Sequence, residues 1–248
     1  MLGLGNSITG GAALDEFTPA NIANLALWLK QGTGITSDGG TPDKVSQWND
    51  SSGNDNHAAQ STSGNQADLV GTGTGVGLDF ERDNADFNNL AADPKITISQ
   101  DHNFIVGFVI SPESLNADDR NCILSDDNNE FVDVRLDKVA INCTGSEVTF
   151  TGDSNLFSNS ATSSVVISRN DGSTGTFTLS VNGVTPAGSF NVTQAKAIEF
   201  DTLGGRNQTG RPYDGIIHEL VVYDLGTGTV TAAELTSLNN YFTSKFGL

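Results

Sequence analysis

The stretch DGIIHELVVYDLGTGTVTAAELTSLNNYFTSKFG, residues 214–247, predicts one strand followed by one helix. In its first half, apolar residues and one histidine occupy alternate positions: Ile216, His218, Leu220 and Val222. Neighbouring side chains of a strand point to opposite faces of its sheet. The alternation therefore predicts a strand with one buried face, toward which His218 also points.

The second half of this stretch carries the start, the apolar face and the end of a helix. Thr231 and Glu234 have the Ser/Thr-x-x-Glu spacing of a capping box, in which each side chain bonds the backbone amide of the other residue. Large apolar residues then recur at helical spacing: Leu235, Leu238, Phe242 and Phe246. Gly247 is a natural stop, so the sequence predicts a short amphipathic helix.

The composition predicts that the remaining chain consists mostly of strands and turns. Of 248 residues, 28 are glycine and only 36% are hydrophobic, which favours many short strands over a helical protein. About a dozen segments have strand character, and we find no internal repeat. We therefore expect an all-β fold, an antiparallel two-sheet jelly roll with one short C-terminal helix.

Residues 102–112 are predicted to form a long central strand, because both of its faces are apolar. One face carries four large residues and the other carries two: Phe104, Val106, Phe108 and Ile110, then Ile105 and Val109. Residues 122–124, 131–136, 139–143 and 148–150 are predicted to follow as an antiparallel meander.

The most specific motif is VSQWNDSSGNDNHAAQ, residues 45–60. Trp48 would anchor a core, and Asp50, Gly53 and Asn54 would supply a tight turn through side-chain caps and a positive φ. A second motif, LALWL at residues 25–29, carries Trp28 in a strand of period two. Both tryptophans are interpreted as core residues.

A third motif ends a predicted strand at Asn182-Gly183, a strong signal for a hairpin turn. Together the motifs resemble those of LamG-like, concanavalin A-like lectin/glucanase domains. The strand with Glu219 and Tyr223 is similar to the G-x-I-x-E-hydrophobic-x-x-Y-D strand with which these domains close. The resemblance covers about residues 22–247, so we interpret residues 21–248 as one jelly-roll domain and the Gly/Ala-rich residues 1–20 as an arm with few core contacts.

The charge restricts the partners. The chain has 30 Asp and Glu against 12 Lys and Arg, a net charge of −18. Such a surface repels nucleic acid and anionic membranes, and no apolar run approaches the length of a membrane span. Solubility in salty surroundings is one reason for the acidity, and calcium binding is another.

Calcium has one candidate region, although no cofactor is required by the sequence. LamG-like and related lectin domains often bind calcium at a rim of loops, and two loops here are dense in oxygen ligands. The candidate ligands are Asp118, Asp119, Asp126, Asp127, Asn128 and Glu130. Ordinary solvated turns are the alternative.

Catalysis is not expected. Asp133, Arg135 and Asp137 share one strand face, but an arginine between two carboxylates would keep both ionised and lower their pKa, the opposite of what a general acid needs. The three histidines lack ligand spacing, and no nucleophile motif is present. For carbohydrate binding, Tyr213 and Tyr241 are the aromatic residues we expect to be exposed.

Cys122 and Cys143 lie in neighbouring predicted strands. The sequence leaves two states open, a disulfide between them or two buried free thiols.

As a whole, the chain resembles small LamG-like proteins of tailed phages that infect marine cyanobacteria, through its MLGLGNSI opening, short arm, single sandwich and negative charge. The resemblance implies a non-enzymatic virion structural protein, made in the host cytoplasm: a head decoration, fibre or baseplate accessory. Its implied partners are capsid, fibre or baseplate proteins and further copies of itself. The alternative is a carbohydrate-binding module for host surface glycan, with or without calcium, and a glycan hydrolase is a third, weaker hypothesis.

Overall fold

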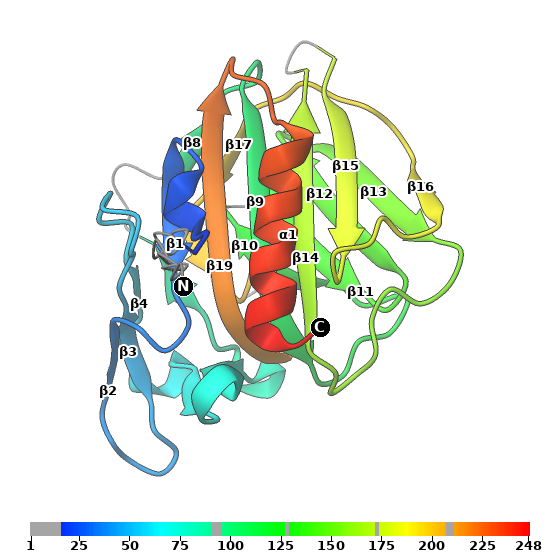
Figure 1. The fold of residues 1–248 in the computed structure, drawn as a ribbon. Coiled ribbons are helices and arrows are strands. Elements are labelled where there is room, and N and C mark those ends of the chain that lie inside the picture. The colour runs from blue at the N-terminus through cyan, green and yellow to red at the C-terminus, as the bar shows by residue number, and fades with distance from the viewer. Residues whose placement is uncertain (1–15, 91–95, 127–128, 172–173, 207–210) are drawn as a thin grey trace, which may run out of the picture.

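The computed structural model describes residues 16–90, 96–126, 129–171, 174–206 and 211–248. Two antiparallel sheets pack face to face, and helix α1 (Ala232–Phe246) covers the outer face of one of them (Figure 1). The expected fold, an all-β jelly-roll sandwich with one C-terminal helix, is confirmed. Among the described residues no helix combines the length and apolar character that a bilayer span requires.

The sheet beneath α1 has seven strands. Six of them follow one order: β15 (Thr176–Val181), β14 (Ser163–Asn170), β9 (Asn103–Pro112), β19 (Gly215–Gly226), β6 (Gly77–Phe80) and β5 (Asp68–Val70). The seventh, β1 (Leu25–Leu29), also pairs with β19.

The second sheet has ten strands. Its order is β16 (Gly188–Phe190), β13 (Ser146–Gly152), β12 (Lys138–Cys143), β11 (Phe131–Arg135), β10 (Asn121–Ser125), β18 (Thr202–Leu203), β7 (Asn88–Asn89), β4 (Ala58–Ala59), β3 (Val45–Trp48) and β2 (Ile35–Ser37). The predicted meander is its run from β10 to β13. A separate pair consists of β8 (Ile96–Ile98) and β17 (Ile198–Phe200), and single 3-10 turns are η1 (Pro19–Asn21), η2 (Ser63–Asn65), η3 (Gly73–Gly75) and η4 (Arg82–Asn84).

Strand β19 is the element around which the seven-stranded sheet is built. One of its edges pairs with β9 along nearly the whole strand. Its other edge pairs first with β6, through residues 215–217, and then with β1, through residues 220–223. The first predicted strand and the last one are therefore neighbours in the fold.

The alternation predicted for β19 is wrong at Ile216 and His218, and Ile217 faces the core instead. The register of β19 against β9 shifts at His218, because a β-bulge inserts one extra residue. Leu220 and Val222 face the core between the sheets as predicted, but the His218 ring lies 5.9 Å from that of Phe246 on α1. The bulge thus turns His218, and Glu219 after it, to the helix side.

Two apolar clusters lie on the two faces of the seven-stranded sheet, and β9 contributes to both as predicted. Its Phe104, Val106, Phe108 and Ile110 belong to the core between the sheets, whereas Ile105 and Val109 pack under α1. Gly107 of β9 lets the helix approach, because a Cβ there would lie 2.9 Å from the Phe242 ring. The helix thus covers what would be an exposed apolar face.

The ends of α1 follow the sequence prediction. The Glu234 amide donates to the Thr231 hydroxyl, and the Thr231 amide donates to the Glu234 carboxylate at 2.8 Å. Gly247 adopts φ 71° and ends the helix. Leu238 and Phe242 are fully buried against the sheet.

The motif at residues 45–60 holds β1 in place. The Asp50 carboxylate accepts a hydrogen bond from the Trp28 amide at 2.9 Å, and the Asn54 amide group donates to the Leu25 carbonyl at 2.7 Å. Gly53 has φ 92° and permits the turn between them. Trp48 is fully buried, as predicted. The polar residues of this motif therefore form a structural clamp on a neighbouring strand as well as a turn.

Asn182 and Gly183 form the predicted two-residue turn, with φ values of 50° and 75°. Val181 and Val184 exchange both backbone hydrogen bonds across it. Two positive φ values in succession are the geometry of a tight hairpin turn, which the Asn-Gly pair favours.

Cys122 and Cys143 are both buried and both free, which decides between the two states left open. Cys143 faces the core between the sheets, whereas Cys122 faces outward toward Asp133. One strand, β11, separates them, so the two thiols cannot meet.

Residues 1–15 of the expected arm lie outside the described residues. The rest of the expected arm belongs to the domain: Pro19 is buried, and Phe17 packs against Tyr241. The expectation of few core contacts is therefore wrong for residues 16–20.

Candidate functional site

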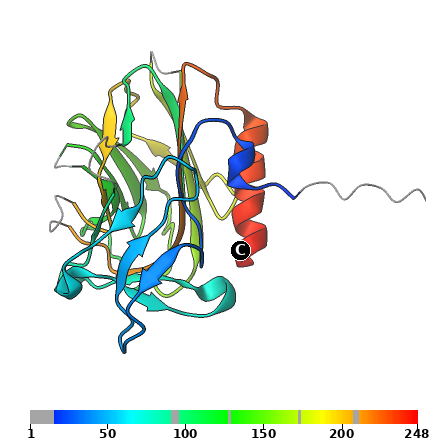
Figure 2. The ribbon, with the colours of Figure 1, turned by 90° about the vertical axis from the view of Figure 1, so that its left-hand side faces the viewer.

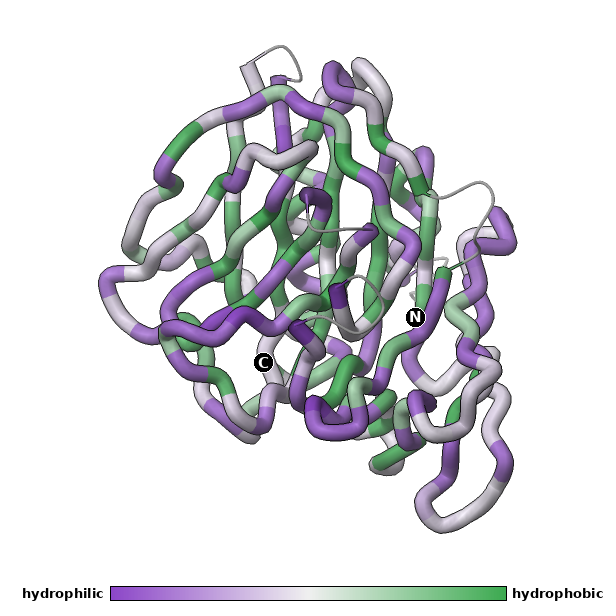
Figure 3. The backbone as a smooth tube through the Cα atoms, turned by 180° about the vertical axis from the view of Figure 1, so that it is seen from behind, coloured by the Kyte–Doolittle hydropathy of each residue, from purple (hydrophilic) through white to green (hydrophobic). Residues whose placement is uncertain are grey.

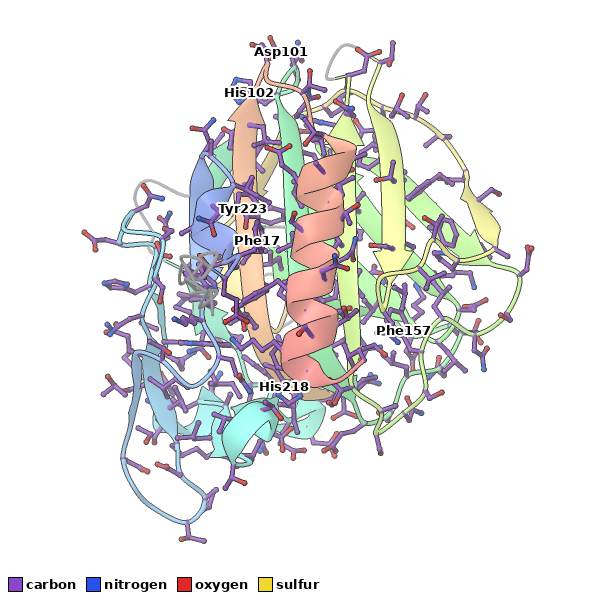
Figure 4. All side chains as sticks on the ribbon, viewed as in Figure 1. Phe17, Asp101, His102, Phe157, His218 and Tyr223 are labelled. Carbon is purple, nitrogen blue, oxygen red and sulfur yellow. The ribbon has the colours of Figure 1, made fainter. Side chains whose placement is uncertain are left out.

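A hollow of about 580 Å³ opens between α1, β1 and the segment before β1, on the helix side of the seven-stranded sheet. We call it the helix-side hollow. Its aromatic and cationic lining residues are Phe17, Trp28, Lys30, Tyr241 and Lys245. Figure 2 shows the segment before β1 lying against α1, and Figure 4 shows Phe17 and Tyr223 at this place.

Three aromatic side chains from distant parts of the sequence meet here. Phe17 precedes η1, Trp28 comes from β1, and Tyr241 comes from α1. The Phe17 and Tyr241 rings meet edge to face, with centroids 6.3 Å apart. Lys30 Nζ lies 4.9 Å from the centre of the Trp28 ring, a cation–π contact. Trp28 is buried, as predicted, while Phe17 and Tyr241 are half-buried.

Glu219 holds these elements together from beneath the hollow. Its carboxylate is fully buried. Oε1 accepts hydrogen bonds from Trp28 Nε1 at 2.7 Å and from the Tyr241 hydroxyl at 2.8 Å. Oε2 accepts from Lys245 Nζ at 2.5 Å, which makes an ion pair. One side chain therefore joins β1, β19 and α1.

Two tyrosines keep their protons at this site. Burial, and then the Glu219 carboxylate, raise the pKa of Tyr241 and of Tyr223. The Tyr241 hydroxyl therefore donates to Glu219, and the Tyr223 hydroxyl donates to the Pro19 carbonyl at 2.9 Å. The second bond ties η1 to the sheet and so positions Phe17.

Small polar side chains of α1 form one rim of the hollow: Ser237, Asn240 and Ser244. Their spacing places them on the same side of the helix as Tyr241. Within the described residues, none of the three side chains makes a hydrogen bond. Their hydroxyl and amide groups are available to a ligand.

Tyr213, predicted as an exposed aromatic, is fully buried in the core between the sheets. Burial raises its pKa well above the ordinary value, and its hydroxyl donates to the Ile216 carbonyl at 3.4 Å. The prediction is wrong because the loop before β19 turns inward, which the local sequence does not indicate. Tyr241, the other predicted residue, does line the hollow.

The described residues of the predicted calcium site do not come together. Asp118 and Asp119 precede β10, and Asp126 and Glu130 follow it. The two pairs thus lie at opposite ends of a five-residue strand, roughly 16 Å long. A single ion cannot span that distance.

Asp119 has other partners instead. Its carboxylate lies 3.6 Å from the Arg82 guanidinium and accepts a hydrogen bond from Asn116 at 2.8 Å. Asp127 and Asn128 lie outside the described residues. Among the residues that are described, no group of three or more His, Cys, Asp or Glu is arranged to hold a metal ion.

The carboxylate of Asp133 lies on the outer face of β11 and is fully buried. Arg120 donates to Oδ2 at 3.0 Å, and Arg135 Nε lies 3.5 Å from Oδ1. Burial outweighs Arg135 and Arg120 and raises the pKa of Asp133 to about 6. The arginines lower this pKa as expected, but the expected net lowering is wrong, because desolvation is the larger effect. Asp137 pairs with Lys138 at 3.0 Å.

The histidines each have local partners in different parts of the molecule. His218 contacts the Ser111 hydroxyl through Nε2 and the Val76 carbonyl through Nδ1, and burial lowers its pKa. His102 pairs with Asp224 at 2.8 Å. Figure 4 shows His102 and His218 at opposite ends of the sheet.

Sequence reasoning missed Phe17, Lys30 and Lys245 as parts of one site. The only available signal was local: Tyr241 and Lys245 are four residues apart on a predicted helix and so share a face. Phe17 and Lys30 come from segments that meet the helix only in the folded chain.

Comparison with solved structures finds the same kind of β-sandwich fold in other domains. Domain 4 of AbnA, a GH43 extracellular arabinanase from Geobacillus stearothermophilus, was solved in complex with arabinotriose; it matches with a TM-score of 0.57 and 16% identity over 87% of this chain and 98% of that domain. No protein-family model and no curated protein matches the sequence.

Two toxin domains have the same architecture. The binding domain of Paraclostridial Mosquitocidal Protein 1 matches with a TM-score of 0.57, 14% identity and 88% of this chain. The botulinum neurotoxin serotype G binding domain matches with a TM-score of 0.53, 15% identity and 89% of this chain. This chain spans 52% of the length of each. The first domain was solved with a bound sugar and the other two are named as binding domains, and at these identities the similarity shows the fold alone.

Proposed function

We propose that the protein is a non-catalytic carbohydrate-binding domain that takes a sugar in the helix-side hollow. The observation that carries the proposal is the lining of that hollow, where three aromatic side chains face a rim of hydroxyl and amide groups that form no hydrogen bond with a described residue. Its volume, about 580 Å³, is within the usual range for small-molecule sites.

The chemistry of this lining suits a saccharide. The C–H face of a sugar ring packs on an aromatic ring, as Phe17 and Tyr241 offer, while sugar hydroxyls exchange hydrogen bonds with Ser237, Asn240 and Ser244. The Glu219 network holds Tyr241 and Trp28 in one orientation. A site that is rigid before binding loses less conformational entropy when it binds.

The fold supports the same class of function. The compared domain of the arabinanase was solved with arabinotriose, and the two toxin domains are named as binding domains. The resemblance of the sequence motifs to LamG-like, concanavalin A-like domains points to the same class.

The carboxylates near the candidate surfaces favour binding over hydrolysis. Glu219 has donors on both oxygens and lies behind Trp28 and Tyr241, so a glycosidic bond cannot reach it. Asp133 is enclosed by two arginines. Glycoside hydrolysis uses a pair of accessible carboxyl groups, and neither residue offers one.

The test is affinity electrophoresis through a panel of neutral and acidic polysaccharides, followed by calorimetry with the best oligosaccharide. Phe17→Ala and Asn240→Ala should each weaken binding by about fivefold or more, which corresponds to one lost contact of about 1 kcal/mol. Phe190→Ala removes a half-buried phenylalanine from β16, away from the hollow, and serves as the matched control.

Binding to no polysaccharide in the panel would overturn the proposal. Equal sugar affinities in Phe17→Ala and Phe190→Ala would show that the sugar binds elsewhere on the domain. Release of reducing sugar from a bound polysaccharide would show that the protein is an enzyme and would overturn the proposal of a non-catalytic domain.

We further propose that this domain works on a phage particle, as a head decoration, fibre or baseplate accessory that presents the hollow to host glycan. The N-terminal composition, the single sandwich and the net charge of −18 support this setting. Quantitative mass spectrometry of purified particles tests it. A copy number near that of the capsid subunit would indicate decoration, a few copies would indicate a fibre or baseplate, and absence from particles would overturn the virion proposal without affecting sugar binding.

A further inference from the structure

Five of the six arginines in this acidic chain lie near one another around strands β10 and β11 of the ten-stranded sheet. They are Arg82, Arg120, Arg135, Arg206 and Arg211. Figure 3 views the molecule from behind, on the side of this sheet and away from α1. In a chain of net charge −18, such a concentration of cations needs an explanation.

The first part of this arginine group surrounds Phe131. Arg120 and Arg206 lie over its ring at 5.1 Å and 5.0 Å. Burial lowers the pKa of Arg206, and the neighbouring cations Arg211 and Arg120 add to this effect. Like charges are therefore crowded here.

The second part lines a small hollow of about 210 Å³, which we call the arginine hollow. Arg82, Arg120, Arg211 and Pro212 line it together with one carboxylate, Asp119. The Arg211 carbonyl accepts a hydrogen bond from the Cys122 amide at 3.2 Å, which anchors this segment beside β10. The hollow thus has a fixed wall of strand backbone.

The three arginines of the arginine hollow differ in how many carboxylates and other acceptors they contact. Arg120 is engaged by Asp133 at 3.0 Å and by Glu147 at 2.5 Å. Arg82 donates to the Asn121 side chain and lies 3.6 Å from Asp119. Arg211 is exposed and has no side-chain hydrogen bond or ion pair to any described residue.

Three of the five arginines, Arg82, Arg120 and Arg135, form ion pairs with Asp119, Asp133 and Glu147. Arg206 and Arg211 form none with a described residue. The guanidinium plane presents donors in a fixed fork that matches the oxygens of sulfate, phosphate and carboxylate groups. Three such forks line one hollow.

We propose that the arginine hollow is a second binding site, specific for a single oxyanionic group: a sulfate, phosphate or carboxylate. Arg211 supplies the unmatched cation, and Arg82 and Arg120 supply further donors. The arginine hollow shares no lining residue with the helix-side hollow, so one domain can hold an acidic group and a sugar ring at separate places.

The probe for the test is sodium sulfate, titrated into the full chain by calorimetry at constant ionic strength with sodium chloride as the balancing salt. Sulfate should bind, and Arg211→Asn should weaken it by about fivefold to tenfold through loss of one charged hydrogen-bonding group. Asparagine suits the backbone at this position, where φ is 50°. Lys196→Asn removes the same charge from an exposed site elsewhere and is the matched control.

The source of the anion is distinguished by a second titration. A sulfated oligosaccharide that binds more tightly than free sulfate, and loses this advantage in Arg211→Asn, would identify an acidic polysaccharide. Inorganic phosphate that binds more tightly than both would identify a phosphate group instead.

No binding of sulfate, phosphate or acetate, or equal affinities in Arg211→Asn and Lys196→Asn, would overturn the proposal. Loss of sugar binding in Phe17→Ala with sulfate binding intact would separate the two sites.

Discussion

Glu219 and Asp133 are two fully buried carboxylates on the outer faces of the two sheets, and their surroundings differ. Glu219 lies under α1, and both of its oxygens accept hydrogen bonds, from a tryptophan, a tyrosine and a lysine. Asp133 lies between two arginines, yet its Oδ1 accepts no hydrogen bond from any described residue.

The difference shows that the number of nearby cations does not decide whether a buried charge is well held. Desolvation costs each carboxylate several kcal/mol, and this cost is recovered only when donors have good geometry. Glu219 has three donors at 2.5–2.8 Å, whereas Asp133 has one donor at 3.0 Å and one cation at 3.5 Å. Glu219 therefore joins β1, β19 and α1, whereas burial raises the pKa of Asp133 to about 6.

The largest effect is expected for Glu219→Ala. It leaves the Lys245 ammonium without its partner and the Trp28 and Tyr241 donors without an acceptor, so the free energy of unfolding should fall by about 3–5 kcal/mol. Urea denaturation measures this. Glu113→Ala, at an exposed glutamate, is the control, and equal losses in the two variants would contradict the role of Glu219.

A smaller loss, about 2–3 kcal/mol, is expected for Lys245→Met, because Glu219 keeps two neutral donors but loses its counter-ion. Arg135→Met should cost less, about 1–2 kcal/mol, because Asp133 and Glu147 both retain Arg120. Both variants are compared by denaturation at neutral pH. A lower stability of Arg135→Met than of Lys245→Met would contradict the conclusion that the Glu219 contacts stabilise the fold more than the Asp133 contacts.

Asp133 should make stability depend on pH with a negative slope. Between about pH 4 and pH 6 the folded protein holds a proton that the unfolded chain has released, because burial raises the folded pKa from 3.8 to about 6. The free energy of unfolding therefore falls as the pH rises through this window and levels off above it.

Asp133→Asn should remove about 3 kcal/mol of this decrease in the free energy of unfolding. Asp79 and Asp86, whose pKa burial also raises to about 6, leave a residual slope in the variant. Denaturation curves at several pH values measure the slope, with Asp83→Asn, at an exposed aspartate, as the control. A variant whose slope equals that of the unaltered protein would assign the effect to other groups.

The smallest effect is expected for Tyr241→Phe. The ring remains in the helix-side hollow, but Glu219 loses one neutral donor at 2.8 Å, which should cost about 1 kcal/mol. Denaturation and sugar binding are measured on the same sample. Retained sugar binding would assign Tyr241 the role of a ring surface, and lost binding would show that its hydroxyl fixes the orientation of that ring.

Local patterns predicted much of the fold. The capping box, the apolar spacing of α1 and the two-faced strand β9 all appear in the structure as predicted, because each depends on residues that are close in sequence. The Asn182-Gly183 turn does as well. The motif at residues 45–60 was recognised as a turn, but its clamp on β1 was not.

The errors have one cause in common. The bulge at His218, the burial of Tyr213 and the separation of Asp118 from Asp126 all depend on which segments pair across the sheets. The pKa of Asp133 was misjudged for a similar reason. The sequence shows the neighbouring arginine, but it does not show the burial whose effect on the pKa is larger than that of the arginine.

The sequence by itself determined the class of fold, the ends of the helix and the tight turns, because strand alternation, capping and turn preferences act over a few residues. Only the tertiary structure decided where the two hollows lie. Phe17, Trp28, Glu219 and Tyr241 are brought together by burial of the apolar face under α1. The arginines are brought together by pairing within the ten-stranded sheet. Both are long-range effects of packing, and no local pattern encodes them.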